Sequence, residues 1–220
     1  MTTILIISSQ QGVEDYWPHV RRLGDIYNEC FEDGDEKEPF YSVILERVQD
    51  TNLKPRTELH ICEDEEGNVL GGAIYDIYQS SLNDKTVHLI YLMVAKEHRR
   101  KGVGTSLLVW SKTEFEFCPI FIEIDKENKD ALEFYKANRA YPVLEDGYVQ
   151  PPLVAGGDWC DNLMLYALNR EPDFWEAYKM LIHLYYGLDV LGTPMGDYRL
   201  EQMREKMQLF YTIKKHFLIF

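Results

Sequence analysis

The sequence of 220 residues predicts an α/β fold of the α+β kind, with a mostly antiparallel mixed sheet, flanking helices and a helical extension at the C-terminus. Three observations predict it. Apolar runs of strand length alternate with segments in which apolar residues recur at helical spacing. Two of these runs, 57–63 and 68–80, are joined by an acidic turn at Glu66-Gly67-Asn68, which is typical of a hairpin. After residue 168 the composition shifts to aromatic and long apolar residues at helical spacing.

The individual elements follow from local periodicity and from turn residues. In the first predicted helix Val20, Leu23 and Tyr27 share one face, and in the second Phe40 and Ile44 do so. Glycines and prolines separate the later runs. The predicted strands cover about 3–8, 57–63, 68–80, 86–95, 119–125, 147–151 and 162–168, and the predicted helices cover about 14–31, 38–50, 104–117 and 128–139.

The last segment, 169–220, is predicted to be helical. Pro172 suits the first turn of a helix, and after a break at 191–196 a last helix runs from about 198 to 216. Its apolar faces have to be buried, so we expect it to pack on the body of the protein or on a second copy in a homodimer. The predicted domains are therefore 1–168 and 169–220.

The most informative motif is a basic turn with two glycines between a predicted strand and a predicted helix. Val94 ends the strand, and a helix-like run begins at Thr105. Glycine lets the backbone turn tightly and approach a ligand closely. The first turn of a helix also presents unpaired N–H groups at the positive end of its dipole, so such a turn binds phosphate. The turn consists of Arg99, Arg100, Lys101, Gly102, Val103, Gly104 and Thr105.

Comparison with known phosphate loops excludes two classes of motif. The turn is not a Walker loop, because no Gly-x-x-x-x-Gly-Lys-Ser/Thr occurs. It is not the dinucleotide fingerprint, because Leu107 stands where that motif needs glycine. Arg99-x-x-Gly102-x-Gly104, with Arg99 five residues after Val94, resembles the acetyl-CoA pyrophosphate loop of the GNAT N-acetyltransferase superfamily.

A second segment supports this resemblance. Asn128, Ala131, Phe134 and Tyr135 fall where the family has an Asn after a strand and then a helix ending in Phe/Leu-Tyr. Asn128 also suits a helix N-cap. The two motifs span about 87–141, and the order of elements is similar over roughly 1–168. The chain departs from the family at 138–141, where Asn-Arg-Ala-Tyr replaces the usual Gly-Phe and weakens the helix stop.

The resemblance implies the GNAT fold, with a sheet splayed between its fourth and fifth strands, acetyl-CoA as co-substrate and no metal. In the family the splay holds the pantetheine arm through backbone hydrogen bonds. The implied acetyl-CoA contacts are Leu92, Met93, Val94, the turn from Arg99 to Thr105, Asn128 and Tyr135.

The resemblance also implies catalytic candidates. Tyr135 matches the family's acid, which protonates the leaving thiolate. Glu123 has the spacing of the base in the ribosomal-protein branch, and His88 has that of the base Glu in the histone branch. Asp76 and Asp125 are further candidates, and water can relay the proton in members without a dedicated base. Each of these residues could instead be an ordinary core or surface side chain.

Six further residues lie on or beside strands that border the acceptor groove in the family. Aromatic residues in strands are otherwise core residues. These acceptor-pocket candidates are Tyr75, Tyr78, Tyr91, Tyr148, Gln150 and Trp159.

The net charge of −14 restricts the partners. Nucleic acids and anionic membranes are disfavoured because both need clustered Lys and Arg, and a cationic substrate is favoured. The acidic segment 32–38 is either a solvated loop or a border of the acceptor site. The chain has no run of membrane-spanning length and no Cys-x-x-Cys pair, and we expect a cytoplasmic protein.

These observations predict an enzyme that transfers an acetyl group from acetyl-CoA to a primary amine. The acceptor is a small cationic molecule, such as a polyamine or aminoglycoside, or a peptide or protein amine. Two alternatives stay open: a non-catalytic module that binds acetyl-CoA, and an acyltransferase that uses a longer acyl-CoA.

Overall fold

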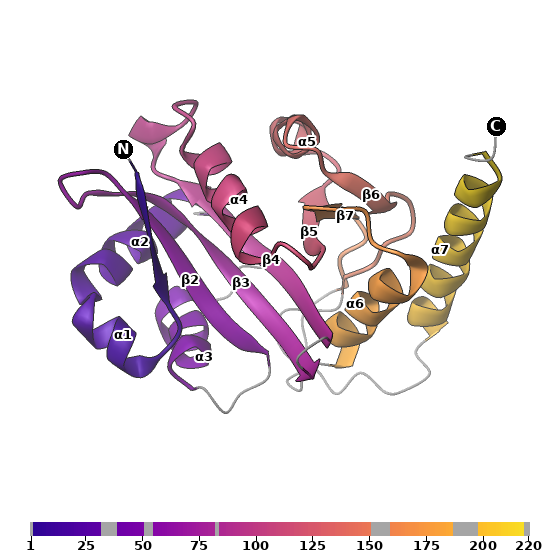
Figure 1. Cartoon of the computed structure of the whole chain (residues 1–220), viewed down its shortest axis with the longest axis horizontal. Coiled ribbons are helices and arrows are strands. Elements are labelled where there is room, and N and C mark those ends of the chain that lie inside the picture. The colour runs from indigo at the N-terminus through magenta and orange to yellow at the C-terminus, as the bar shows by residue number, and fades with distance from the viewer. Residues whose placement is uncertain are drawn as a thin grey trace. The chain divides into compact units, whose positions relative to one another are not determined.

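The computed structural model describes residues 2–31, 39–50, 55–81, 84–150, 159–186 and 198–217. The chain forms two compact units, Met1–Glu116 and Phe117–Phe220, and each is described by itself (Figure 1). The acidic segment 32–38 and the break at 191–196 lie outside the described residues.

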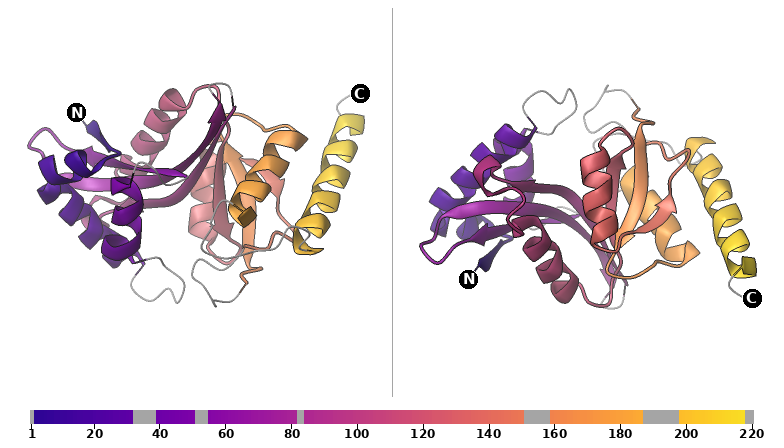
Figure 2. Two further views of the ribbon diagram at one scale, coloured as in Figure 1. Left: turned by 90° about the horizontal axis from the view of Figure 1, so that it is seen from below. Right: turned by 90° about the horizontal axis from the view of Figure 1, so that it is seen from above.

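The first unit is a four-stranded antiparallel sheet in the order β1-β2-β3-β4. Helices α1, α2 and α3 cover one face, and α4 covers the other (Figure 1, Figure 2). The elements are β1 (Thr3–Ile7), α1 (Gln10–Asp15), α2 (Trp17–Cys30), a π-helical turn η1 (Phe40–Ile44), α3 (Leu45–Gln49), β2 (Arg56–Glu63), β3 (Val69–Ser81), β4 (Asp84–Val94), a 3-10 turn η2 (Lys96–His98) and α4 (Val103–Glu114).

Alternation along the strands sends apolar side chains to both faces of this sheet. Leu59 and Ile61 of β2 pack with Leu23 and Ile26 of α2 in one buried cluster. On the other face α4 buries Leu107, and its Ser111 hydroxyl hydrogen-bonds the hydroxyl of Tyr75 on β3. Both faces are therefore covered, which fixes the register of the strands.

Gly71 lets the end of β4 lie close against β3. Gly71 is paired with Val94, the last residue of β4. A Cβ on Gly71 would collide with the carbonyl oxygen of Met93 and lie 3.0 Å from the Cα of Val94. Both atoms belong to backbone, which cannot rotate away as a side chain can.

Gly71→Ala should therefore lower the free energy of unfolding by about 1–3 kcal/mol, the usual cost of overpacking. Urea unfolding would measure it. Gly12→Ala is the control, because the added methyl would meet the Ile7 side chain at 3.2 Å in a helix that favours alanine. Equal stability losses in the two variants would contradict the close-approach explanation.

A buried polar group lies under α4. His60 Nε2 and Glu58 Oε2 are 3.1 Å apart, and Arg56 lies 2.7 Å from the other carboxylate oxygen. Burial acts to raise the pKa of Glu58, but the His60 hydrogen bond and the charges of Arg56 and Lys85 outweigh it, so the pKa lies below its ordinary 4.5.

The lowered pKa of Glu58 leads to a prediction for acid unfolding. A lowered native pKa means that the Glu58 carboxylate stabilises the fold above pH 4.5 and that this contribution is lost as the pH falls through the native value. Glu58→Gln should cost about 1–3 kcal/mol at pH 7. Its unfolding free energy should also change less than that of the wild type between about pH 6 and pH 3. Identical slopes in urea unfolding across that range would contradict this.

The second unit is a three-stranded antiparallel sheet in the order β5-β7-β6. Helix α5 lies on one face, and α6 and α7 lie on the other (Figure 2). The elements are β5 (Ile120–Asp125), α5 (Lys129–Ala137), β6 (Tyr141–Leu144), β7 (Leu163–Leu168), α6 (Phe174–Tyr186) and α7 (Tyr198–Phe217).

The helices of the 169–220 segment share a core with this sheet. Phe121 of β5 and Leu165 of β7 pack with Met180 of α6 and with Met203 and Met207 of α7. The predicted division at 168/169 stays a prediction, and the compact units divide at 116/117.

Three predicted elements are corrected. The helix over 14–31 is split into α1 and α2, because Pro18 lies in the first turn of α2, where a continuous helix would lose a hydrogen bond and clash with the ring. The strand at 147–151 is wrong: the strand is β6, at 141–144. Its Pro142 is tolerated because β6 lies at the edge of the sheet. Gly147, with φ of +77°, then turns the chain.

The third correction concerns the end of α5, which stops at Ala137. Asn138 donates its side-chain amide to the Phe134 carbonyl at 2.9 Å, and Arg139 takes the left-handed conformation, with φ of +61°. The stop therefore forms without the family's glycine. Apart from such details, the predicted α/β class with a mostly antiparallel sheet is confirmed. The predicted splay between the fourth and fifth strands stays a prediction.

Candidate functional site

The basic glycine turn lies at the N-terminus of α4. Gly102 is the N-cap residue, with φ of +86° and ψ of −3°. The first bond of the helix runs from the Ser106 N–H to the Gly102 carbonyl at 2.9 Å. The N–H groups of Val103, Gly104 and Thr105 precede that bond and have no carbonyl within their own helix to donate to.

The backbone around these groups has the alternating conformation that is typical of anion-binding turns. Arg100 has φ of +60°, so left-handed residues lie on both sides of Lys101. Alternating conformations of this kind turn successive N–H groups toward one point. A Cβ placed on Gly102 would meet no atom within 4 Å, so the space in front of it is open. The first turn of α4, all of it described, carries no acidic side chain. The turn therefore fits a pyrophosphate.

Arg99 fixes the base of the turn. Its Nε donates to the Val94 carbonyl at 3.1 Å, and one of its terminal nitrogens lies 3.3 Å from Cys30 Sγ at the end of α2. Its guanidinium thus joins the end of β4 to α2. In this arrangement Arg99 shapes the turn, while Arg100 and Lys101 remain the residues proposed to add charge next to a phosphate.

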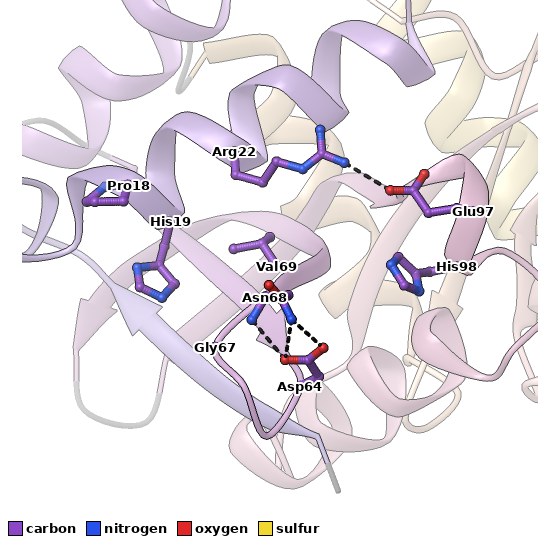
Figure 3. A pocket seen from close by; sticks show the side chains of 9 residues that line it. All are labelled: Pro18, His19, Arg22, Asp64, Gly67, Asn68, Val69, Glu97 and His98. Carbon is purple, nitrogen blue, oxygen red and sulfur yellow. Dashed lines mark hydrogen bonds and ion pairs between the residues drawn. The ribbon is translucent and has the colours of Figure 1, made fainter.

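A cavity of about 440 Å³ lies beside η2, immediately before this turn (Figure 3). Within it Arg22 of α2 pairs with Glu97 at 3.1 Å, and the Asn68 amide donates to Asp64 at 2.9 Å. The cavity was not predicted, because its residues come from three separate stretches of sequence. Its lining residues are Pro18, His19, Arg22, Asp64, Gly67, Asn68, Val69, Glu97 and His98.

The end of β4 is irregular where the pantetheine contacts are predicted. The pairing of β3 with β4 shifts between Ile74 and Tyr75, so that Ile90 is left out of the register and forms a bulge. Leu92, Met93 and Val94 follow it and pair with Ala73, Gly72 and Gly71. Alternate residues of such a strand direct their N–H and C=O groups away from β3, and bulges are frequent beside active sites.

His88 lies in the interior of the first unit. It is 5% exposed and stands opposite Asp76, which is also buried. The Asp76 carboxylate accepts from the Thr57 hydroxyl at 2.6 Å and lies 3.8 Å from Arg47. The buried polar group around Asp76 is therefore held by three strands and α3. That His88 or Asp76 acts as the catalytic base stays a prediction.

Asn128 and Tyr135 are placed by α5 in the second unit. Asn128 is the N-cap, and its side-chain oxygen accepts from the Ala131 N–H at 3.0 Å. This leaves its amide nitrogen as the donor for a ligand. Tyr135 lies in the last turn of α5 with its ring against Phe134. Burial raises the pKa of its phenol well above the ordinary 10, so the group keeps its proton throughout the neutral range.

Glu123 lies on β5 and is held by two donors. The Tyr148 hydroxyl donates to Oε1, and the Gln150 amide donates to Oε2 at 2.8 Å. Two of the predicted acceptor-pocket residues thus meet the predicted base. Asp125, the outside candidate, accepts from the Glu127 N–H and from the Asn162 amide, both at 2.8 Å, so it organises the turn after β5.

Glu123 and α5 lie on opposite faces of the second sheet. Glu123 stands opposite Leu165, which faces α6 and α7 in the core. Tyr166, its neighbour on β7, faces the other way, and Lys136 of α5 lies over its ring. Tyr135 and Glu123 therefore approach any common ligand from different sides of β5.

The other acceptor-pocket candidates contribute mainly to packing. Tyr75 and Tyr78 are buried, and Tyr91 packs its ring against Tyr27 at 5.0 Å between centroids. Trp159 stacks on the Arg199 guanidinium of α7 at 4.2 Å. Sequence periodicity could not separate these packing aromatics from Tyr148, because all occupy apolar surroundings.

Sequence comparison gives the family. Residues 20–140, more than half of the 220-residue chain, match the profile described as the acetyltransferase (GNAT) family. The chain belongs to the GNAT family. As a GNAT member it is an acyltransferase. The matched range contains both motifs that predicted the family, the basic turn at 99–105 and the segment from Asn128 to Tyr135. A search of curated protein sequences found no match.

Solved structures with the same fold agree with this GNAT assignment. One is an acetyltransferase assigned to the GNAT family from Bacteroides thetaiotaomicron, at 17% identity and a TM-score of 0.61, covering 86% of this chain and 99% of that chain. Another, of the same description, comes from Desulfovibrio desulfuricans, at 16% identity and a TM-score of 0.51, covering 76% of this chain and 98% of that chain. The GNAT fold is confirmed.

None of the helices that the structure describes has the length and apolar character needed to cross a membrane. Within the same ranges, no three His, Cys, Asp or Glu side chains come together as a metal site would require.

Proposed function

We propose that the protein is an acetyl-CoA-dependent N-acetyltransferase that acts on a primary amine of a small cationic molecule or of a peptide. The observation that carries this proposal is the conformation of Gly102. This residue caps α4 in the left-handed conformation, a Cβ placed on it would meet no atom within 4 Å, and the three helix N–H groups that follow it have no carbonyl within their own helix. That arrangement suits a doubly charged pyrophosphate.

The residues proposed to bind acetyl-CoA are those that the resemblance to the GNAT family implies. The turn Arg99–Thr105 would hold the pyrophosphate, and the backbone of Leu92, Met93 and Val94 would hold the pantetheine arm. The Asn128 amide nitrogen would donate to the same arm. Bound acetyl-CoA supplies an activated acyl thioester.

The proposed proton transfers use Glu123 and Tyr135. Glu123 accepts a proton from the acceptor amine, and Tyr135 donates to the departing sulfur. Because the pKa of Tyr135 is raised by burial, complete proton transfer to a thiolate is less favourable than for a free phenol. A strong hydrogen bond to the developing thiolate is the role that suits this phenol best.

The net charge supports a cationic acceptor. With 37 acidic against 23 basic residues, the field of the protein attracts ammonium groups and repels anions. His88 is retained as a second candidate for the base, since the buried carboxylate of Asp76 stands opposite it.

The test has two stages. Acetyl-CoA binding is measured by calorimetry and by the thermal shift at millimolar ligand, and thiol release is then followed over a panel of polyamines, aminoglycosides and peptide amines. We expect binding and release with at least one cationic amine. Absence of binding would overturn the proposal, and binding without release from any amine would favour a regulatory acetyl-CoA-binding module. Faster thiol release from a longer acyl-CoA than from acetyl-CoA would favour an acyltransferase that uses a longer acyl chain.

A further inference from the structure

The Glu123 carboxylate is held in one orientation by a single short loop. Tyr148 donates to Oε1 and Gln150 donates to Oε2 at 2.8 Å, so both oxygens receive a hydrogen bond from this loop. Two donors on different oxygens fix the plane of a carboxylate. A base that accepts a proton from a substrate needs such a defined orientation.

The loop that supplies both donors has little regular structure of its own. Tyr148 and Gln150 are two residues apart, which in an extended chain places them on the same side. Gln150 forms an isolated pair with Cys160, with N···O distances of 2.7 and 3.1 Å. Tyr148 is 0% exposed, so its ring cannot turn away without opening the core.

Helix α7 supplies much of the packing that holds this loop. Its Met203 sulfur accepts from the Val149 N–H at 3.3 Å, between the two donors. Leu200, Met203 and Met207 share one buried cluster with Tyr148. The Lys206 side chain lies so close over Gly147 that a Cβ there would collide with it. Four residues of one helix thus contact residues 147–149 or pack beside them.

We infer that Tyr148 and Gln150 are positioning residues that orient Glu123 toward the acceptor amine, and that α7 holds them in place. The family match ends at residue 140, so the loop and α7 both lie beyond it. The inference rests on the proposed function of Glu123. It gives the C-terminal helices a role in catalysis in addition to their role in the core.

A double-mutant cycle tests the first half of this inference, the positioning of Glu123 by Tyr148 and Gln150. Tyr148→Phe, Glu123→Gln and the double variant are assayed with the amine that the wild type acetylates. Tyr148→Phe should lower kcat/KM for the amine about 10-fold to 100-fold, with KM for acetyl-CoA unchanged within about twofold. In the Glu123→Gln background the same change should have little further effect, because the group that Tyr148 orients is gone. Gln150→Leu should behave in the same way.

Several outcomes would overturn this half. Effects that multiply in the double variant would show that Tyr148 acts independently of Glu123. Full activity of Tyr148→Phe beside a strongly impaired Glu123→Gln would overturn the positioning role alone. Absence of thiol release by the wild type, or full activity of Glu123→Gln, would instead count against the proposed function and, with it, this inference.

The role of α7 is tested with variants of one helix. Met203→Leu keeps the buried volume but removes the sulfur acceptor, and Met203→Ala removes both. Leu209→Ala is the control, since Leu209 is 62% exposed on the same helix. We expect kcat/KM for the amine to fall from wild type to Met203→Leu to Met203→Ala, with KM for acetyl-CoA constant and Leu209→Ala unchanged. If Met203→Ala does not fold, Met203→Leu alone decides. Wild-type activity of Met203→Leu would overturn the role of α7.

Discussion

Replacing Tyr135 by Phe should lower kcat about 100-fold or more while leaving the affinity for acetyl-CoA nearly unchanged. The substitution removes one hydroxyl and keeps the ring, so the packing against Phe134 persists. If the phenol donates to the departing sulfur, its loss is felt only in the transition state, and kcat and kcat/KM fall together. Steady-state thiol release and calorimetric binding of acetyl-CoA measure the two quantities.

The raised pKa of Tyr135 adds a condition on pH. Burial moves the pKa above 10, so the phenol stays protonated below that pH and cannot cause an alkaline loss of activity there. The pH profiles of the wild type and of Tyr135→Phe should therefore share the same shape below pH 10. Tyr141→Phe, in β6 of the same unit, is the control and should keep full activity. Unchanged turnover in Tyr135→Phe would show that another group protonates the sulfur.

The second large effect is expected at Gly102. Gly102→Val should raise the dissociation constant for acetyl-CoA about 10-fold or more, because a branched side chain cannot easily keep φ of +86°. The new side chain would also occupy the open space beside Gly102, next to the proposed pyrophosphate site. Calorimetry measures the affinity, and urea unfolding measures the accompanying loss of about 1–2 kcal/mol in stability.

Gly67 provides the matched control for this variant. It has φ of +81°, and a Cβ on it would also meet no atom within 4 Å, but it lies at the β2–β3 turn. Gly67→Val should thus lose a similar amount of stability and keep its affinity for acetyl-CoA. A loss of affinity in both variants would mean that instability, and not the turn itself, explains the effect of Gly102→Val.

Much of the fold could be predicted because the decisive signals are local. The hairpin at Glu66-Gly67-Asn68 joins β2 to β3, and the glycine turn joins β4 to α4, each within a few residues. Where prediction failed, a contact distant in sequence decided. The strand predicted at 147–151 forms instead at 141–144, because β7 offers β6 an edge position that tolerates Pro142.

The candidate site divides in the same way. The phosphate turn depends on the conformation of a few successive residues, and glycine spacing is enough to predict it. The surroundings of Glu123 depend on Tyr148 and Gln150, which are 25 and 27 residues away along the chain. Both residues were predicted beside an acceptor pocket, but nothing in their spacing indicated that they donate to Glu123.

By itself the sequence determined the family, the glycine turn proposed to bind phosphate and the acidic character of the protein, because these follow from neighbouring residues and from composition. Only the tertiary structure decided that His88 is buried opposite Asp76, that Glu123 is held by one loop, and that α7 packs on that loop. The physical reason is that burial and hydrogen bonding between distant segments depend on how strands pair and helices pack. A motif at the beginning of α4 carries no information about those contacts. The sequence alone could therefore predict the proposed acetyl-CoA turn, but not the surroundings of Glu123.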